Sequence, residues 1–241
     1  MKNIINSIQE MCGRSEEYLI DRYPKNYFDF YIDVGARGIL NPWHVNLIAE
    51  KNTNTLCVAY EPDVPYYKEL VEAAEQQQLN NLHVEKLGFG TGEKIKIPAS
   101  LEEKDYTKKW EEVETVTLVN IFDKYDLKGD KSWAIKIDCE GGEYALWKEE
   151  CKESVEILKT ADHIAIEFHN LNSRKYNNFF SIHNPLPLNF QMVEYWINGV
   201  FSSTHEIFLT SDEPYNGLRT YVMLSKDVLS QKDELFWKEI L

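Results

Sequence analysis

The sequence lacks any uninterrupted apolar run of the ~20 residues that a membrane helix needs. The stretch from Met1 to Tyr18, MKNIINSIQEMCGRSEEY, alternates apolar and polar residues and lacks the continuous apolar core of a signal peptide. These two absences predict a cytoplasmic protein without membrane insertion.

Cysteine is scarce, and its four positions form no CxxC pair and have no neighbouring histidines: Cys12, Cys57, Cys139 and Cys151. This scatter disfavours a zinc site, because zinc ligands usually come in closely spaced pairs. Scattered, unpaired cysteines also fit a reducing compartment.

Basic residues are in deficit, with 26 Lys and Arg against 40 Asp and Glu, which gives a formal net charge of −14. So negative a surface repels phosphate backbones and anionic lipid headgroups at long range. The charge therefore predicts that nucleic acid is not a partner.

The 241 residues are 43% hydrophobic, enough for a sizeable core, and contain no repeat or low-complexity tract. Helical spacing of apolar residues predicts an N-terminal helical lead-in over residues 1–26. From Tyr27 the chain becomes aromatic and β-branched, and we predict one domain over residues 27–241.

Short apolar runs alternate with amphipathic stretches along this domain. The predicted strands cover 27–35, 55–62, 81–89, 90–98, 114–122, 133–138, 163–170, 205–211 and 219–225. The predicted helices cover 43–51, 65–78, 143–158, 189–199 and 227–241. Strands joined by helices indicate a parallel α/β sheet, with the last two strands forming an antiparallel hairpin at its edge and residues 90–98 and 114–122 forming an extra hairpin.

Ligands of open parallel sheets bind at the carboxyl ends of the strands, so the residues that end each strand are the candidate site. Gly35 ends the first strand and permits close backbone approach to a ligand. Glu61 ends the second strand, where an acid can accept both ribose hydroxyl protons of an adenosine. Together they indicate an adenosine-containing cofactor.

A dinucleotide requires GxGxxG, but the turn DVGARG has only Gly35 and Gly38, preceded by Asp33. An acid at that position suits the cationic sulfonium and amino group of S-adenosylmethionine and would repel a pyrophosphate. The charge pattern therefore favours the methyl donor.

The motifs YIDVGA, VAYEP, IKIDCEGGEY and IAIEFH, between Tyr27 and Asn170, are similar in type and order to those of FkbM-type methyltransferases. The resemblance implies the class I methyltransferase (Rossmann-like) fold, a seven-stranded mostly parallel sheet with its last strand antiparallel and helices on both faces. It also implies S-adenosylmethionine as cofactor and O-methyl transfer to a sugar, glycan or secondary metabolite. The chain departs from the family at Arg37-Gly38-Ile39, where Asn and Ile-Gly are usual.

Combining resemblance and position, we predict cofactor contacts at the ends of the first four strands: Asp33, Gly35, Ala36, Arg37, Glu61, Gly88, Phe89 and Asp138. His169 is the predicted catalytic base, because imidazole titrates near neutrality and this one ends the fifth strand. Asp138 and Glu167 are the predicted acidic partners. Glu143 is expected to complement the dipole of its own helix.

Three sets of alternatives remain. Asp138, Glu140 and Glu167 offer oxygen ligands for Mg²⁺, an alternative to a metal-free site. Loop aromatics and polar groups, together with Glu140, are predicted to contact a small-molecule or glycan acceptor: Trp43, His44, Arg174, Tyr176 and His183. A NAD(P)-dependent oxidoreductase and a non-catalytic cofactor-binding domain are the alternative functions, and a homo-oligomer is compatible with the sequence.

Overall fold

The computed structural model describes residues 20, 23–37, 45–98, 110–127, 129–139, 141–169, 190–213, 218–232 and 236. The predicted helical lead-in lies outside these residues, apart from positions 20 and 23–26. None of the helices within the described ranges has the length and apolar composition needed to cross a bilayer.

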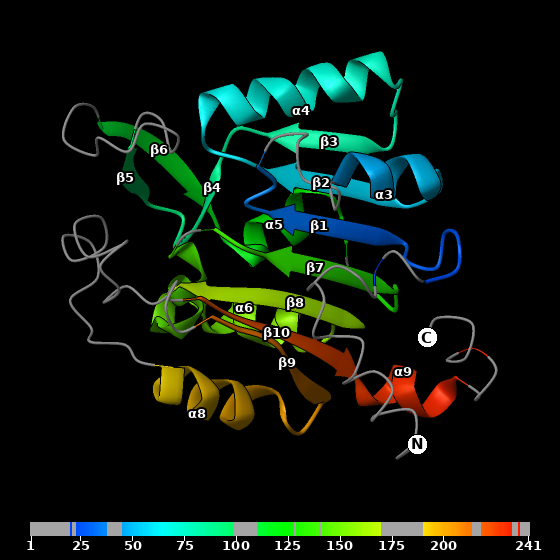
Figure 1. The fold of residues 1–241 in the computed structure, drawn as a ribbon, viewed down its shortest axis with the longest axis vertical. Coiled ribbons are helices and arrows are strands. Elements are labelled where there is room, and N and C mark those ends of the chain that lie inside the picture. Colours follow the sequence, from blue (N-terminus) through cyan, green and yellow to red (C-terminus); the bar gives the residue numbers. More distant parts are fainter. Residues whose placement is uncertain are drawn as a thin grey trace.

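Seven of the described strands form one sheet in the order β3-β2-β1-β7-β8-β10-β9 (Figure 1). Their bounds are β1 Phe30–Val34, β2 Leu56–Tyr60, β3 Leu82–Glu85, β7 Trp133–Ile137, β8 His163–His169, β9 His205–Glu213 and β10 Leu218–Ser225. β1, β2, β3, β7 and β8 pair in parallel, whereas β10 is antiparallel to both β8 and β9. The predicted mostly parallel sheet with an antiparallel last strand is confirmed.

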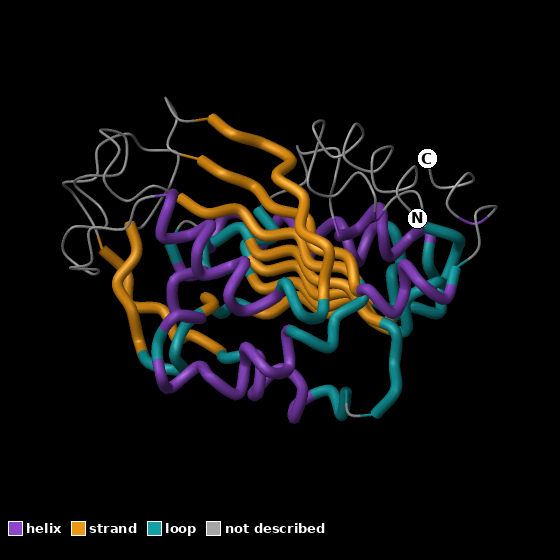
Figure 2. Tube along the Cα trace, turned by 90° about the horizontal axis from the view of Figure 1, so that it is seen from below, coloured by secondary structure: helices purple, strands orange, loops and turns teal. Residues whose placement is uncertain are grey.

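Helices cover both faces of this sheet, as Figure 2 shows for the stacked strands. One face carries α5 Leu118–Lys124, α6 Lys152–Leu158 and α8 Phe190–Phe201, and the other carries α3 Val45–Lys51, α4 Val64–Gln76 and α9 Lys226–Gln231. Strand residues divide between the two faces by alternation. Ile32 and Ile135 join the first core, while Tyr31 and Ala134 join the second.

This alternation places two charged residues inside the sheet. Asp33 on β1 and Lys136 on β7 are register partners, and both are buried. Because their apolar strand neighbours Ile32 and Ile135 occupy the other core, Asp33 and Lys136 lie together on the face covered by α3, α4 and α9.

A second, small sheet stands where the parallel strands end (Figure 1). It consists of β4 Gly88–Phe89, β5 Lys94–Pro98 and β6 Trp110–Val116, with β5 and β6 antiparallel. The predicted pairing of the two extra segments is thus confirmed. Strand β5 forms one edge of this small sheet.

Three predicted boundaries were wrong. The segment 81–89 is two strands, because the chain leaves the main sheet after Glu85 and β4 pairs with β6 instead. The segment 114–122 ends as a strand at Val116, since Thr117 and Asn120 form a reciprocal capping box that starts α5. The segment 143–158 begins as 3₁₀ turns, Gly142–Trp147 and Glu149–Cys151, before α6.

Candidate functional site

A cavity of about 190 Å³ lies at the carboxyl ends of the parallel strands, beside the point where strand order reverses between β1 and β7. Its walls come from the turns after β1, β2 and β7 and from the small sheet. The lining residues include Gly35, Arg37, Tyr60, Glu61, Gly88, Phe89, Ile95, Lys96, Ile97, Asp138, Cys139, Gly141, Gly142 and Tyr144. Of the predicted cofactor residues, Gly35, Arg37, Glu61, Gly88, Phe89 and Asp138 therefore meet at one cavity.

The turn after β1 requires its glycine twice over. Gly35 has φ +78°, a conformation that residues with a Cβ adopt with strain. A Cβ there would also overlap the backbone carbonyl of Asp138, which follows β7. The next residue, Ala36, is buried, and its N–H donates to the Tyr60 carbonyl at 3.2 Å. Gly35 thus lets the turns after β1 and β7 pack against each other beside the cavity.

Glu61 is a buried carboxylate in the cavity wall. Oε2 accepts a hydrogen bond from the backbone N–H of Arg37 at 2.9 Å, and Oε1 accepts from that of Asp63 at 2.8 Å. Burial raises the pKa of Glu61 to about 7, although the two N–H donors favour the charged form. A carboxylate has about four acceptor positions, so Glu61 retains capacity for further donors.

Asp33 is held by a cation from its own protein. Lys136 Nζ lies 3.3 Å from Asp33 Oδ1, 3.1 Å from the Gly35 carbonyl oxygen and 3.5 Å from Asp138 Oδ2. Burial raises the pKa of Asp33, and the Lys136 ammonium opposes part of that rise. The described part of the cavity wall does not include Asp33. Its nearest positive charge is Lys136, a partner that the sequence argument for a ligand sulfonium did not consider.

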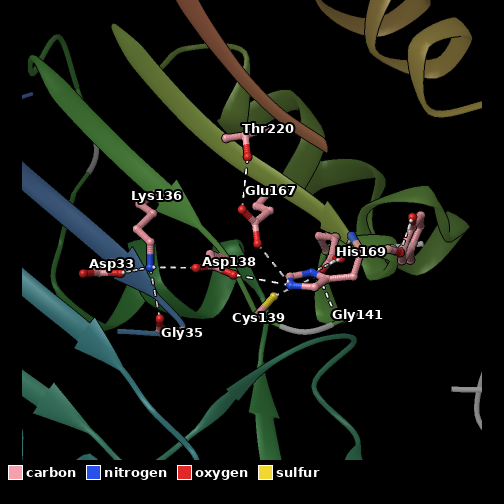
Figure 3. A network of polar contacts seen from close by, with 11 residues as sticks. Asp33, Gly35, Lys136, Asp138, Cys139, Gly141, Glu167, His169 and Thr220 are labelled. Carbon is pink, nitrogen blue, oxygen red and sulfur yellow. Dashed lines mark hydrogen bonds and ion pairs between the residues drawn. The ribbon is translucent and has the colours of Figure 1, made fainter. Parts of the chain in front are cut away.

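Asp138, Glu167 and His169 converge at the ends of β7 and β8 (Figure 3). His169 Nε2 lies 3.3 Å from Glu167 Oε1 and 3.6 Å from Asp138 Oδ1. The imidazole is 1% exposed. Among the described residues, the cavity wall includes Asp138 but neither Glu167 nor His169. Asp138 therefore links the cavity to the other two groups.

Glu143 contacts His169 at Nδ1, whereas Nε2 of the same ring faces Asp138 and Glu167. Glu143 lies in the first turn after β7, as predicted, although this turn is 3₁₀, and it is fully buried. Oε1 accepts from the His169 backbone N–H at 3.0 Å and lies 3.0 Å from Nδ1, while Oε2 accepts from the Gly141 N–H at 2.8 Å. Tyr144, the next residue, donates its hydroxyl to the His169 carbonyl at 2.9 Å. His169 is thus fixed by two consecutive residues.

Sequence reasoning missed Lys136, Glu143 as a partner of His169, and the contribution of β5. An available signal for Lys136 was a charged residue inside the apolar run WAIKI, which implies a buried partner. Of the predicted acceptor residues, Trp43, His44, Glu140, Arg174, Tyr176 and His183 lie outside the described residues. The predicted metal set of Asp138, Glu140 and Glu167 is incomplete in the described residues for the same reason.

No protein-family model matches the chain, and no curated protein matches its sequence. Among solved structures, it is similar to a "putative rRNA-methylase from Clostridium thermocellum" (TM-score 0.52, 10% identity, 88% of this chain and 96% of that chain). It is also similar to a "putative methyltransferase from Thermobifida fusca YX" (TM-score 0.50, 10% identity, 90% and 81%). The METTL16 methyltransferase domain gives a TM-score of 0.46 at 15% identity; the match covers 87% of this chain and 64% of that chain.

At 10% identity these likenesses concern the fold. The mostly parallel seven-stranded sheet, with β10 as its one antiparallel strand among those described, and the helices on both faces agree with that fold. The chain therefore has the class I methyltransferase fold, while membership of the FkbM-type family stays a prediction.

Proposed function

We propose that the chain is an S-adenosylmethionine-dependent O-methyltransferase that acts on a hydroxyl of a sugar, glycan or secondary metabolite. The observation that carries the proposal is the cavity itself. It joins the Gly35 turn, the Glu61 carboxylate and an apolar wall to Asp138, whose Oδ1 faces an imidazole.

The residues of the cavity suit an adenosine. Glu61 has acceptor capacity beyond its two backbone donors and can take ribose hydroxyl protons. The wall also contains Phe89, Ile95 and Ile97, apolar side chains suited to a flat purine. Tyr60, another wall residue, adds an aromatic ring to this surface, and its buried hydroxyl has no hydrogen-bond partner among the described residues.

S-adenosylmethionine would supply a methyl group on a sulfonium, and transfer leaves S-adenosylhomocysteine, a methyl ether and a proton. The protein has to align the acceptor oxygen and remove its proton. Asp138 lines the cavity, whereas the His169 ring is buried behind it. We therefore assign activation of the hydroxyl to Asp138, Glu167 and His169 acting together, with Asp138 facing the acceptor.

The acceptor class rests on the sequence. A net charge of −14 disfavours RNA, the substrate in the name of one similar structure, because phosphates would be repelled. A glycan or small-molecule acceptor does not require a positively charged surface. The absence of GxGxxG after β1 likewise disfavours a dinucleotide-dependent oxidoreductase.

Isothermal titration calorimetry with S-adenosylhomocysteine and S-adenosylmethionine tests the cofactor. We expect both to bind and Glu61→Gln to weaken binding of both, with Glu149→Gln on the exposed surface as a matched control. If neither compound binds, the enzyme proposal is wrong. A reduced nicotinamide cofactor that binds in their place would favour the oxidoreductase alternative.

A transfer screen against nucleotide sugars, glycans, small phenols and RNA, followed by mass spectrometry, tests the acceptor. We expect the mass of one added methyl group on a hydroxyl compound. Methylated RNA as the sole product would overturn the predicted acceptor class while leaving the methyltransferase proposal in place.

A further inference from the structure

We infer that Asp138, Glu167 and His169 form a binding site for a divalent transition-metal ion of the Mn²⁺ class. Each offers one ligand atom, and these atoms all lie within 4.8 Å of one another. His169 Nε2 is 3.3 Å from Glu167 Oε1 and 3.6 Å from Asp138 Oδ1. Metal–ligand bonds of ~2.1 Å place adjacent ligands of an octahedral ion about 3.0 Å apart, and the two distances from His169 Nε2 exceed that spacing by at most about 0.6 Å.

All three groups are held by a partner on their far side, as Figure 3 shows for Lys136 and Thr220. Asp138 Oδ2 faces Lys136 Nζ at 3.5 Å, and Glu167 Oε2 accepts from the Thr220 hydroxyl at 3.1 Å. The third group, His169, has Nδ1 3.0 Å from Glu143 Oε1. Outer-shell contacts of this kind orient metal ligands in proteins. Asp138 Oδ1, Glu167 Oε1 and His169 Nε2 are thereby directed toward one point.

The proton of the neutral imidazole is assigned to Nδ1 by its partner. Glu143 Oε1 already accepts the backbone N–H of His169, so it acts as an acceptor toward the ring as well. A neutral ring with its proton on Nδ1 presents the Nε2 lone pair to Asp138 and Glu167. Two carboxylate oxygens and a lone pair that face one another attract a cation. The alternative to a metal ion is a second proton on Nε2, which would make His169 an imidazolium that pairs with Asp138 and Glu167.

The donor set selects the class of ion. Mg²⁺ prefers oxygen ligands and retains waters, whereas imidazole nitrogen suits first-row transition metals. Two carboxylates with one imidazole from this chain leave further positions of an octahedral ion open. Asp138 brings the site to the cavity wall, where a hydroxyl of a ligand can reach an open position. This set replaces the predicted Glu140 by His169.

The catalytic part of the inference rests on the proposed methyl transfer. A cation at this point would lower the pKa of the acceptor hydroxyl, so that its proton passes to water. His169 would then be a metal ligand rather than the base. Metal binding itself is independent of that reaction and can be measured without any cofactor.

The test is titration of the chelator-treated full chain with MnCl₂. Binding is monitored by calorimetry and by the loss of the free-Mn²⁺ electron paramagnetic resonance signal. We expect one ion per chain. Glu167→Gln should weaken binding at least tenfold, and Glu143→Gln about 10- to 100-fold through the imidazole. Glu149→Gln changes the charge equally on an exposed side chain and should bind as wild type does. Absence of Mn²⁺ binding by the folded wild-type chain, or equal affinity of Glu167→Gln and Glu149→Gln, overturns the metal site.

A second titration separates this inference from the proposed function. S-adenosylhomocysteine should bind to the chelator-treated chain, because Glu61 and the Gly35 turn are outside the triad. Cofactor binding without Mn²⁺ binding overturns the metal site alone. The reverse result, Mn²⁺ binding without cofactor binding, overturns the methyltransferase proposal alone. Methyl transfer, once an acceptor is found, should cease in EDTA and return with Mn²⁺; transfer that survives EDTA overturns the catalytic role of the ion.

Discussion

Lys136 and Asp33 form a buried ion pair across neighbouring strands, with Nζ 3.3 Å from Oδ1 and both side chains at most 5% exposed. Because the two residues are register partners on β7 and β1, the pair bridges the strands at the switch point of the sheet. The same ammonium contacts Asp138 Oδ2 and the Gly35 carbonyl. One buried cation therefore joins the turn after β1 to the triad.

Replacing Lys136 by Met should destabilise the protein by about 3–5 kcal/mol at pH 7, because Asp33 would be buried without its cation. Urea unfolding, monitored by circular dichroism, measures this loss of stability. Asp33→Asn in the same chain should recover much of it, and the double-mutant cycle gives the coupling. Lys152→Met, which removes an exposed pair with Glu149, should change stability little.

The pH dependence of Lys136→Met has a defined sign. Without the cation, the folded-state pKa of Asp33 is raised further above its unfolded value, since burial acts unopposed. The variant should therefore be most stable below the unfolded pKa and lose stability as pH rises through the folded pKa. A variant as stable as wild type at pH 7 would contradict the importance of the pair.

Gly35→Ala should disrupt the site, because the methyl group would overlap the Asp138 carbonyl as well as strain a φ of +78°. Gly129→Ala is the matched control: its φ is +103°, but no atom of the described residues lies within 4 Å of the added Cβ. We expect Gly129→Ala to cost about 1–3 kcal/mol from strain alone. Gly35→Ala should cost more in thermal unfolding and lose cofactor affinity. Equal losses in the two variants would show that the collision is relieved cheaply.

The sequence predicted the sheet and the strand ends well because both follow from local patterns. Apolar runs ending in Gly35 or Glu61 mark strands and their carboxyl ends without knowledge of the rest of the chain. The pairing of Lys136 with Asp33 depends instead on strand register, 103 residues apart in sequence. Register is a property of the assembled sheet, so an isolated motif cannot reveal it.

Glu143 illustrates a second limit. An acid in the first turn of a helix is usually explained by the helix dipole, and Glu143 does occupy such a turn. Its burial and its bonds to His169 arise because β8 lies beside β7 and ends at the same edge. The segmentation errors at Lys86 and Thr117 have a related cause, since strand propensity continues past the point where pairing or a cap ends the strand.

Cys139 should be unreactive although it lines the cavity. Burial and the neighbouring carboxylates Glu143 and Asp138 raise the pKa of its thiol well above the usual value, so the nucleophilic thiolate is not populated at pH 8. Burial likewise raises the pKa of Cys57 to about 12. Iodoacetamide at pH 8, followed by peptide mass spectrometry, should label neither residue in the folded chain and both in urea. Rapid labelling of Cys139 in the folded chain would contradict the raised pKa of its thiol.

Glu61 should make cofactor affinity depend on pH near neutrality. Burial raises its pKa to about 7, and only the ionised carboxylate accepts at both oxygens while keeping capacity for ribose hydroxyls. Affinity for S-adenosylhomocysteine should therefore fall as pH drops from 8 to 6, by about tenfold one unit below the pKa. Calorimetry across this range measures the effect, and Glu61→Gln should flatten it.

Stability of the cofactor-free chain should change in the opposite direction. A carboxyl whose folded pKa lies above its unfolded value binds more protons when folded, so its contribution is present below pH ~4.5 and lost as pH rises through about 7. Asp162, which is remote from the cavity lining, has its pKa raised to about 6 by burial and provides the control. Asp162→Asn should alter the stability profile but leave the affinity profile unchanged. If Asp162→Asn flattened the affinity profile and Glu61→Gln did not, the ribose contact assigned to Glu61 would be wrong.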